Sequence, residues 1–146
     1  MKTIARRRQR TGQSLVEFAL VLIPFMFLLL GVVDLGRGIA ANNGVAQAAR
    51  EIARATSSHP GVPLGSSAET AAVISTQRGT VLGLSNAGST ITFTCTDIAD
   101  NAYATTDCAR GKYVRVEVRV GFSVLTPLLS MVAPKTLTST SHIEIE

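Results

Sequence analysis

One carboxylate in this sequence stands where a negative charge is costly. Glu17 is followed by sixteen residues without a charge, FALVLIPFMFLLLGVV at 18–33. An acidic side chain at the centre of a membrane helix costs about 2.5–3.5 kcal/mol, and somewhat less near the boundary, so it is expected to have a function and a positively charged partner. Gly12 lies five positions earlier. A basic cluster precedes that glycine: Arg6, Arg7, Arg8 and Arg10.

Two cysteines, Cys95 and Cys108, offer a second kind of chemistry. They form no C-x-x-C pair, and the two histidines lie far from them, so a zinc site has too few ligands. In a domain outside the cytoplasm, we expect a disulfide that closes a short loop and stabilises the fold by up to about 3 kcal/mol. The alternative is two unpaired thiols in a cytosolic domain. The apolar segment upstream favours the disulfide.

The remaining polar residues do not form a catalytic pattern. Asp97, Asp100 and Asp107 lie close together, but they lack the order of an EF-hand and are expected to form a solvated acidic loop. His59 precedes a proline and His142 lies in a terminal strand, so both are expected to be solvated. There is no G-x-S-x-G, and the glycine-rich GVVDLGRG does not follow a strand as a phosphate loop would. We therefore expect no enzymatic activity, catalytic residue, cofactor, metal or small-molecule substrate.

The positive charge is concentrated before Gly12. The chain has 14 basic and 10 acidic residues, and five of the basic ones, Lys2 and the four arginines, precede that glycine. From Gln13 onward 9 basic residues face 10 acidic ones, a net charge of −1. A nucleic-acid-binding protein needs basic residues spread over a folded face. We therefore expect no nucleic-acid partner.

The glutamate lies near the start of a long predicted helix. Residues 13–34 are long enough to cross a membrane of about 30 Å, and membrane helices tolerate a proline such as Pro24. The helix continues past Asp34 with an amphipathic stripe at 45–53. It ends at HPGVP, residues 59–63, after about forty residues.

The rest of the chain predicts one short helix and a small sheet. A capping-box-like Ser66-x-x-Glu69 opens a helix that ends near Gly79 or Gly83. Alternating apolar residues then predict about three strands, at 91–95, 114–122 and 136–146. The predicted fold is α+β, with a long N-terminal membrane-spanning helix whose second half packs on a small antiparallel sheet, as in pilins.

The stretch GQSLVEF, from Gly12 to Phe18, resembles the processing site of type IV prepilins. Such sites have a short basic leader, a glycine at the cut, glutamate as fifth residue of the mature chain, and then an apolar helix. The wider sequence, which continues through LLLGVVDLGRG to AQAAREIAR, resembles the TadE-like pseudopilins of tight-adherence (type IVb) pilus systems. The resemblance extends, less closely, into VRVEVRVGFSVLTPLLSMVAPKTLTSTSHIEIE, where such proteins end in strands around a proline-containing segment. Residues 60–112 do not contribute to it.

The resemblance implies a cut by a membrane-embedded prepilin peptidase between Gly12 and Gln13 at the cytoplasmic face. Glycine suits close approach of the peptidase to the backbone, because it has no side chain. The cut creates a new α-amine at Gln13, and the corresponding amine is N-methylated in other pilins. This amine could pair with Glu17 of a neighbouring subunit. Glu17 and Phe18 would then serve subunit assembly. The alternative for Glu17 is a carboxylate that reaches the lipid headgroups without a protein partner.

The implied organisation is a prepilin-type leader at 1–12, a transmembrane and assembly helix at 13–34, and an extracytoplasmic α+β headpiece at 35–146. The basic flank predicts a cytoplasmic N-terminus in the inner membrane. Expected partners are the prepilin peptidase, other pilins or pseudopilins, inner-membrane pilus assembly proteins and membrane lipid. Since the major pilins of such systems are shorter and lack a headpiece, the resemblance implies a minor pilus component or an assembly factor. The alternative is an uncleaved single-pass anchor that presents a periplasmic binding domain.

Overall fold

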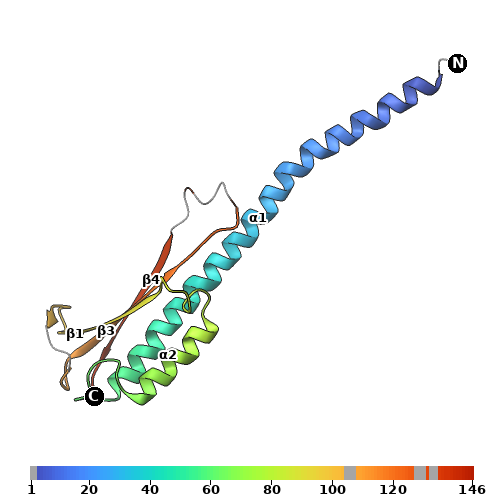
Figure 1. Ribbon diagram of the computed structural model, residues 1–146. Coiled ribbons are helices and arrows are strands. Elements are labelled where there is room, and N and C mark those ends of the chain that lie inside the picture. Colours follow the sequence, from blue (N-terminus) through green and yellow to red (C-terminus); the bar gives the residue numbers. More distant parts are fainter. Residues whose placement is uncertain (1–2, 104–107, 127–130, 132–134) are drawn as a thin grey trace. The chain divides into compact units, whose positions relative to one another are not determined.

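The computed structural model describes residues 3–103, 108–126, 131 and 135–146, and of residues 3–11 the backbone alone (Figure 1). The described elements are, in chain order, α1 (Thr3–Ser57), α2 (Ala68–Thr80), β1 (Thr90–Thr96), β2 (Ala102–Tyr103), β3 (Tyr113–Gly121) and β4 (Thr136–Glu144). The predicted α+β fold, a long apolar helix followed by a small antiparallel sheet, is confirmed. The chain divides into two compact units, Met1–Gly36 with Val124–Ala133 and Arg37–Ser123 with Pro134–Glu146.

Helix α1 begins earlier than the sequence pattern predicts. It starts at Thr3 and includes the backbone of the basic segment, whose side chains at Arg6, Arg7, Arg8 and Arg10 lie outside the described residues. Alanine, arginine and glutamine are good helix formers, so a helix that already exists at Gln13 can extend through them at little cost. Pro24 lies inside the helix without ending it.

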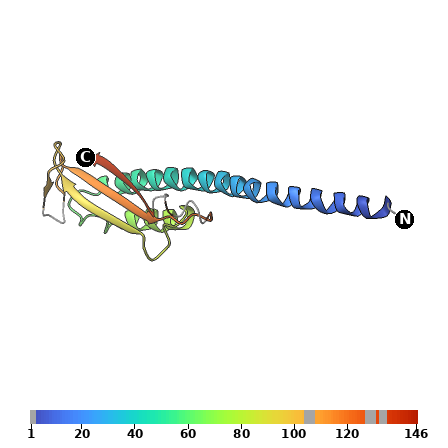
Figure 2. The same cartoon turned by 90° about the horizontal axis from the view of Figure 1, so that it is seen from above.

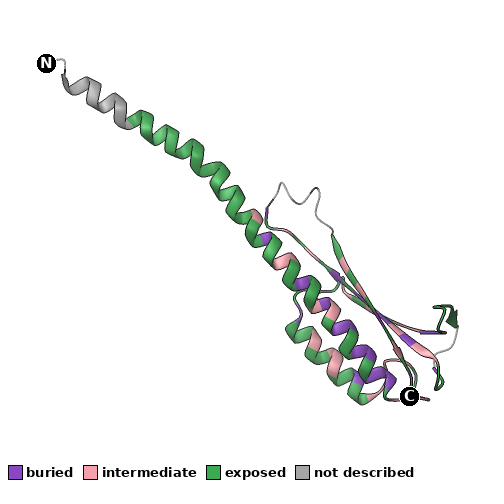
Figure 3. Ribbon diagram, turned by 180° about the vertical axis from the view of Figure 1, so that it is seen from behind, coloured by how far each residue is buried: buried purple, intermediate pink, exposed green. Residues whose placement is uncertain are grey.

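The two halves of α1 differ in burial, as the colours of Figure 3 show. From Gly12 to Val33 no residue is buried, whereas the second half carries a buried stripe. Six of its residues are at most 2 % exposed: Ala41, Val45, Ala48, Ala49, Ile52 and Ala53. The amphipathic stripe predicted at 45–53 is therefore confirmed, and it belongs to the second compact unit.

The sheet has the order β2-β1-β3-β4, and all its pairings are antiparallel. The alternation predicted for residues 114–122 is borne out, because every second side chain of β3 is buried. Val114, Val116, Val118 and Val120 are at most 1 % exposed. The second half of α1 packs on this valine face together with Val81 and Leu84, and α2 lies beside α1 (Figures 1 and 2). Small alanines in the α1 stripe allow the helix to approach the sheet closely.

Strand β2 was not predicted from the sequence. It is only two residues long, and it pairs with the end of β1 through Cys95↔Tyr103 and Thr96↔Ala102. A two-residue strand carries no readable alternation, so the hydrophobic period cannot reveal it.

The N-cap of α2 lies one residue later than predicted. Ser67, in extended conformation, accepts a hydrogen bond from Thr70 N at 3.1 Å, and the helix begins at Ala68. The hydroxyl of Ser66 instead donates to Pro63 O in the preceding turn. Glu69 lies in the first turn, where the helix dipole favours a negative charge.

The predicted disulfide is present. Cys95 of β1 bonds to Cys108, with 5.5 Å between their Cα atoms and a sequence separation of 13. Both cysteines are 2 % exposed and belong to the hydrophobic core. The bond closes the loop that contains β2, part of which, residues 104–107, lies outside the described residues.

We predict that the disulfide protects both thiols and stabilises the headpiece. Alkylation of the native, exported protein without reductant should modify neither Cys95 nor Cys108, and alkylation after reduction in denaturant should modify both. Replacing both cysteines by serine should lower the free energy of unfolding by up to about 3 kcal/mol, because the unfolded chain then regains loop entropy. Labelling of the native protein before reduction would contradict the bond.

Two glycines near the end of α2 give a matched test of the core. Gly83 has φ +86°, and a Cβ there would lie 2.7 Å from Val120 Cγ1 and 3.1 Å from Gly121 O. Gly79 is helical with open space around it. Gly83→Ala should therefore destabilise the protein by more than about 1 kcal/mol, and Gly79→Ala should stabilise it by up to about 1 kcal/mol. Chemical unfolding of the detergent-solubilised chain, followed by circular dichroism, measures both. Equal effects would contradict the described turn.

Candidate cleavage and assembly site

The predicted cleavage position, Gly12, lies on α1 in open space. A Cβ built on Gly12 would have no heavy atom within 4 Å. A glycine inside a helix costs about 0.8–1 kcal/mol relative to alanine. The described fold therefore gives no steric reason for glycine here, and its presence requires another explanation.

Gln13 and Glu17 lie one helical turn apart on α1, at positions i and i+4. Both are exposed, as is Phe18, whose side chain is 63 % exposed. Residues four apart on a helix share a face, so an α-amine at position 13 would lie near the side of the helix that carries Glu17. Within the described part of the chain, the carboxylate of Glu17 is not engaged in an ion pair.

The surface beyond Phe18 is apolar on every side of the helix. Leu20, Ile23 and Leu28 are 70, 61 and 65 % exposed, values typical of a helix without a protein neighbour in this chain. The most apolar 18-residue window within Gly12–Ser57 has a mean hydropathy of 2.6 and no buried residue, so α1 is long and apolar enough to cross a membrane. A helix that is hydrophobic all round is stable only when lipid or other helices surround it.

A shallow apolar depression lies on this helix around Pro24. Its lining residues are Leu22, Ile23, Met26, Phe27 and Leu30, and its volume is about 240 Å³. No polar atom contributes to its surface. Such a depression can accept an apolar side chain of another helix or of a lipid.

The carboxylate of Asp34, at the end of the apolar run, was not recognised from the sequence as a functional group. It is 3 % exposed, and it accepts hydrogen bonds from Leu125 N at 2.9 and 3.0 Å and from Thr126 N at 2.7 Å. All three residues belong to the first compact unit. An acidic residue at the end of the apolar run is visible in the sequence. Its hydrogen-bond donors are not, because they lie 91 and 92 positions later in the chain.

Two of the three aspartates that were compared with the EF-hand pattern, Asp97 and Asp100, have partners within the protein. Asp97 accepts hydrogen bonds from Ala99 N, Asn101 N and Asn101 Nδ2 at 2.8–2.9 Å. The bonds from Asn101 are the main reason why the pKa of Asp97 is lowered from its ordinary value of 3.8. Asp100 forms a salt bridge with Arg115 at 3.0 Å. The described residues contain no cluster of three metal-ligating side chains, and Asp107 lies outside them.

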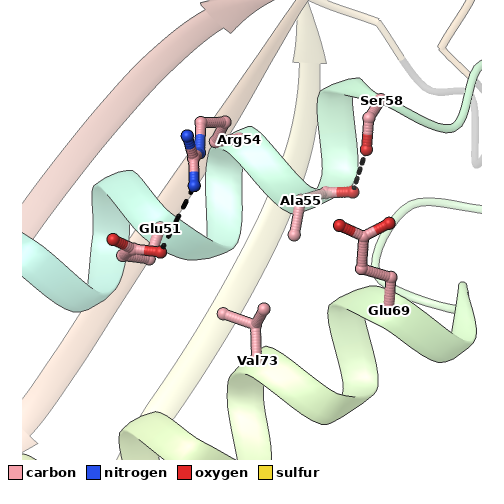
Figure 4. Close-up of a pocket in the computed structure, with 6 residues that line it drawn as sticks. All are labelled: Glu51, Arg54, Ala55, Ser58, Glu69 and Val73. Carbon is pink, nitrogen blue, oxygen red and sulfur yellow. Dashed lines mark hydrogen bonds and ion pairs between the residues drawn. The ribbon is translucent and has the colours of Figure 1, made fainter.

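A polar groove lies between α1 and α2, in the second compact unit (Figure 4). It has a volume of about 360 Å³ and is lined by Glu51, Arg54, Ala55, Ser58, Glu69 and Val73. Glu51 and Arg54 form an exposed ion pair at 4.0 Å, and His59 Nε2 lies 3.5 Å from Glu69 Oε2. The groove therefore has mixed charge, and the Ser58 hydroxyl lies 3.1 Å from His59 Nδ1 beside it. The groove is hard to predict from the sequence, because its lining residues come from two separate segments of the chain.

The class defined by these features is an α+β protein with an exposed apolar N-terminal helix. Residues 12–54 match the family model described as TadE-like protein. This match confirms the TadE-like resemblance over residues 12–54, which lie within α1. It suggests a component associated with the Tad pilus. In comparisons with curated proteins and with solved structures, none matches the chain.

Proposed function

We propose that this protein is a minor pilin-like component or assembly factor of a tight-adherence type IV pilus. A prepilin peptidase removes residues 1–12, and the trimmed chain joins other pilins or pseudopilins through its apolar helix. The observation that carries this proposal is the TadE-like match, which begins at Gly12 and includes Glu17 and the exposed apolar surface. The role is structural and does not involve catalysis.

The surroundings of Gly12 support its role as a recognition residue for the peptidase. Because no neighbour in the described chain would touch a side chain at this position, the folded protein itself tolerates a larger residue. A peptidase that must reach the backbone does not, since a side chain would obstruct its approach. Selection for cleavage therefore explains a glycine that helix stability disfavours.

Cleavage also gives Glu17 a partner. The cut makes Gln13 the first residue of α1, and its amine and the free N–H groups of the first turn carry positive charge. Glu17 then lies near the positive end of its own helix and can also meet the amine of an adjacent subunit. In an apolar setting the attraction is strong, but desolvation offsets much of it, so the pair fixes the register between helices more than it adds stability.

The helix surface beyond Glu17 supplies the area for packing. The exposed side chains from Phe18 to Val33 and the depression around Pro24 offer apolar contacts on all sides. In lipid, helices associate through close packing and hydrogen bonds rather than through the hydrophobic effect. In this proposal the chain crosses the inner membrane with its basic N-terminus in the cytoplasm and its headpiece outside. Inner-membrane assembly proteins are further proposed partners.

The first prediction of this proposal concerns mass. The protein extracted from membranes of peptidase-competent cells should be lighter than the full chain by residues 1–12. Gly12→Leu should abolish this difference by blocking the peptidase. Gly31→Leu is the matched control, because Gly31 lies on the same helix and also has open space around it. A full-length mass for the unmodified protein would refute cleavage and favour the uncleaved anchor with a periplasmic binding domain.

The second prediction concerns the charge of Glu17. Glu17→Gln should leave cleavage intact but cause loss of pili or of surface adherence, since the amide cannot pair with the terminal amine. Glu51→Gln removes an exposed acid farther along α1 and should change neither cleavage nor pili. Pilus counts by electron microscopy and adherence assays measure both variants. Unchanged pili in Glu17→Gln would contradict the assembly role. The alternative, in which the Glu17 carboxylate reaches the lipid headgroups without a protein partner, would then be favoured.

A further inference from the structure

The bond that the peptidase is proposed to cut lies inside an unbroken helix. Helix α1 (Thr3–Ser57) includes both Gly12 and Gln13 (Figure 1). In an α-helix each carbonyl accepts a hydrogen bond from the N–H four residues later. The Gly12 carbonyl is therefore bonded to Val16 N, and Gln13 N is bonded to the carbonyl of Gln9. Both groups of the scissile peptide are engaged within the helix itself.

Hydrolysis of this bond requires access to its carbonyl carbon. The reaction consumes one water: the water oxygen joins the carbonyl carbon of Gly12, the C–N bond breaks, and the nitrogen of Gln13 takes a proton and leaves as the amine. Attack needs the water and the peptidase's acid and base groups in defined positions around the peptide. In the helix, adjacent turns lie on both sides of this peptide and its carbonyl oxygen already has a donor. The hydrogen bonds that span the cut must open first.

The residues around the bond form helices poorly. Thr11, Gly12 and Ser14 have lower helix propensity than the arginines and glutamine that precede them and the leucine that follows. Threonine loses side-chain freedom in a helix, glycine loses the most backbone entropy, and serine can bond to the backbone in non-helical conformations. We call residues 11–14 the unwinding segment. Three of its four residues are poor helix formers, so α1 is locally weak where the cut is proposed.

Tertiary packing does not close the helix at the scissile bond. No residue at positions 12–33 is buried, and a Cβ built on Gly12 would meet no heavy atom within 4 Å. Most helical stability in proteins comes from packing, and short unpacked helical segments are marginal in water. Since α1 begins at Thr3, only a few turns of helix lie on the leader side of the cut. Local helix propensity therefore determines how often these turns open.

We propose that the unwinding segment opens the leader end of α1 before the peptidase cuts, and that its low helix propensity sets the rate of cleavage. This inference rests on the proposed cleavage between Gly12 and Gln13. Short helical segments open and close within about a microsecond, whereas enzymes turn over about 1–1,000 times per second. The cleavage rate then follows the population of the open form. Thr11 is a positioning residue, because it acts through the conformation of the backbone.

Substitutions of Thr11 separate helix propensity from recognition of the side chain. Thr11→Ala raises helix propensity and should slow removal of the leader about threefold. Thr11→Val, the conservative variant, removes the hydroxyl but keeps a β-branched side chain of similar propensity, so it should retain the original rate. Thr11→Gly should cut at least as fast as the unmodified chain. Pulse-chase labelling of the full chain in peptidase-competent cells measures these rates as conversion of precursor to the shorter form.

Gly31→Ala is the matched control. It also raises the helix propensity of α1 at a position with open space, but it lies far from the cut, so the rate should not change. Equal slowing by Gly31→Ala and Thr11→Ala would show an effect of overall helix stability and would overturn the role of the unwinding segment.

Amide hydrogen exchange measures the opening without the peptidase. The full chain is purified in detergent from cells that lack the peptidase, and exchange is followed at the amides of Gln13 and Val16, whose hydrogen bonds span the cut. Both amides should exchange about threefold more slowly in Thr11→Ala and at the original rate in Thr11→Val. Slower cleavage of Thr11→Ala without slower exchange would contradict the inference.

The outcomes distinguish the inference from the proposed function. Slowing of cleavage in Thr11→Ala but not in Thr11→Val, matched by slower exchange, supports the unwinding segment. Equal cleavage rates in Thr11→Ala and the unmodified chain overturn it and leave the proposed processing intact. Equal slowing in the Ala and Val variants means that the peptidase recognises the hydroxyl, and the inference is wrong. Absence of cleavage in the unmodified chain refutes the proposed processing, and the inference with it.

Discussion

One helix carries two different apolar patterns, and the rest of the structure depends on the change from one to the other. The first half of α1 is apolar on every side, and its residues from Gly12 to Val33 remain unburied by the protein. The second half is apolar on one stripe only, where Val45 and Ile52 are fully buried. The change occurs over a few residues around Asp34 and Arg37. A sequence that kept the first pattern to Ser57 could not form the core on the sheet, and one that began with the second could not enter lipid.

The core shows why the stripe is rich in alanine. Three alanines, Val45 and Ile52 of this stripe share one core cluster with the valines of β3, so small side chains alternate with two larger ones where the helix meets the sheet. Gly44 extends this close packing, since a Cβ there would lie 3.3 Å from Val81 Cγ1. Close packing of this kind makes large-to-small and small-to-large changes both costly. The headpiece therefore depends on the helix as much as on its own strands.

The sequence predicted the elements with strong periodicity and missed those without it. The amphipathic stripe at 45–53 and the alternation in β3 were read correctly, because each repeats many times. Strand β2 is too short to repeat, and the cap of α2 was placed at Ser66 because Ser66 and Ser67 both fit a capping position. The disulfide was predicted from the expected compartment, and it is present between Cys95 of β1 and Cys108. Gly12 and Glu17 were singled out through a motif, and their roles stay predictions. Asp34 was not, because its partners come from the opposite end of the chain.

The burial of α1 determines where a soluble fragment of this protein could begin. Ala41 is 2 % exposed, and the buried stripe continues from it to the end of the helix. A fragment that started at α2 would expose the valine face of β3 to water and would be expected to aggregate. One that started between Arg37 and Ala41 would keep every helical residue of the core and omit the half that is apolar on all sides. Crystallisation or NMR of the headpiece therefore requires about a third of α1 to be retained, the part from about Ala41 to Ser57.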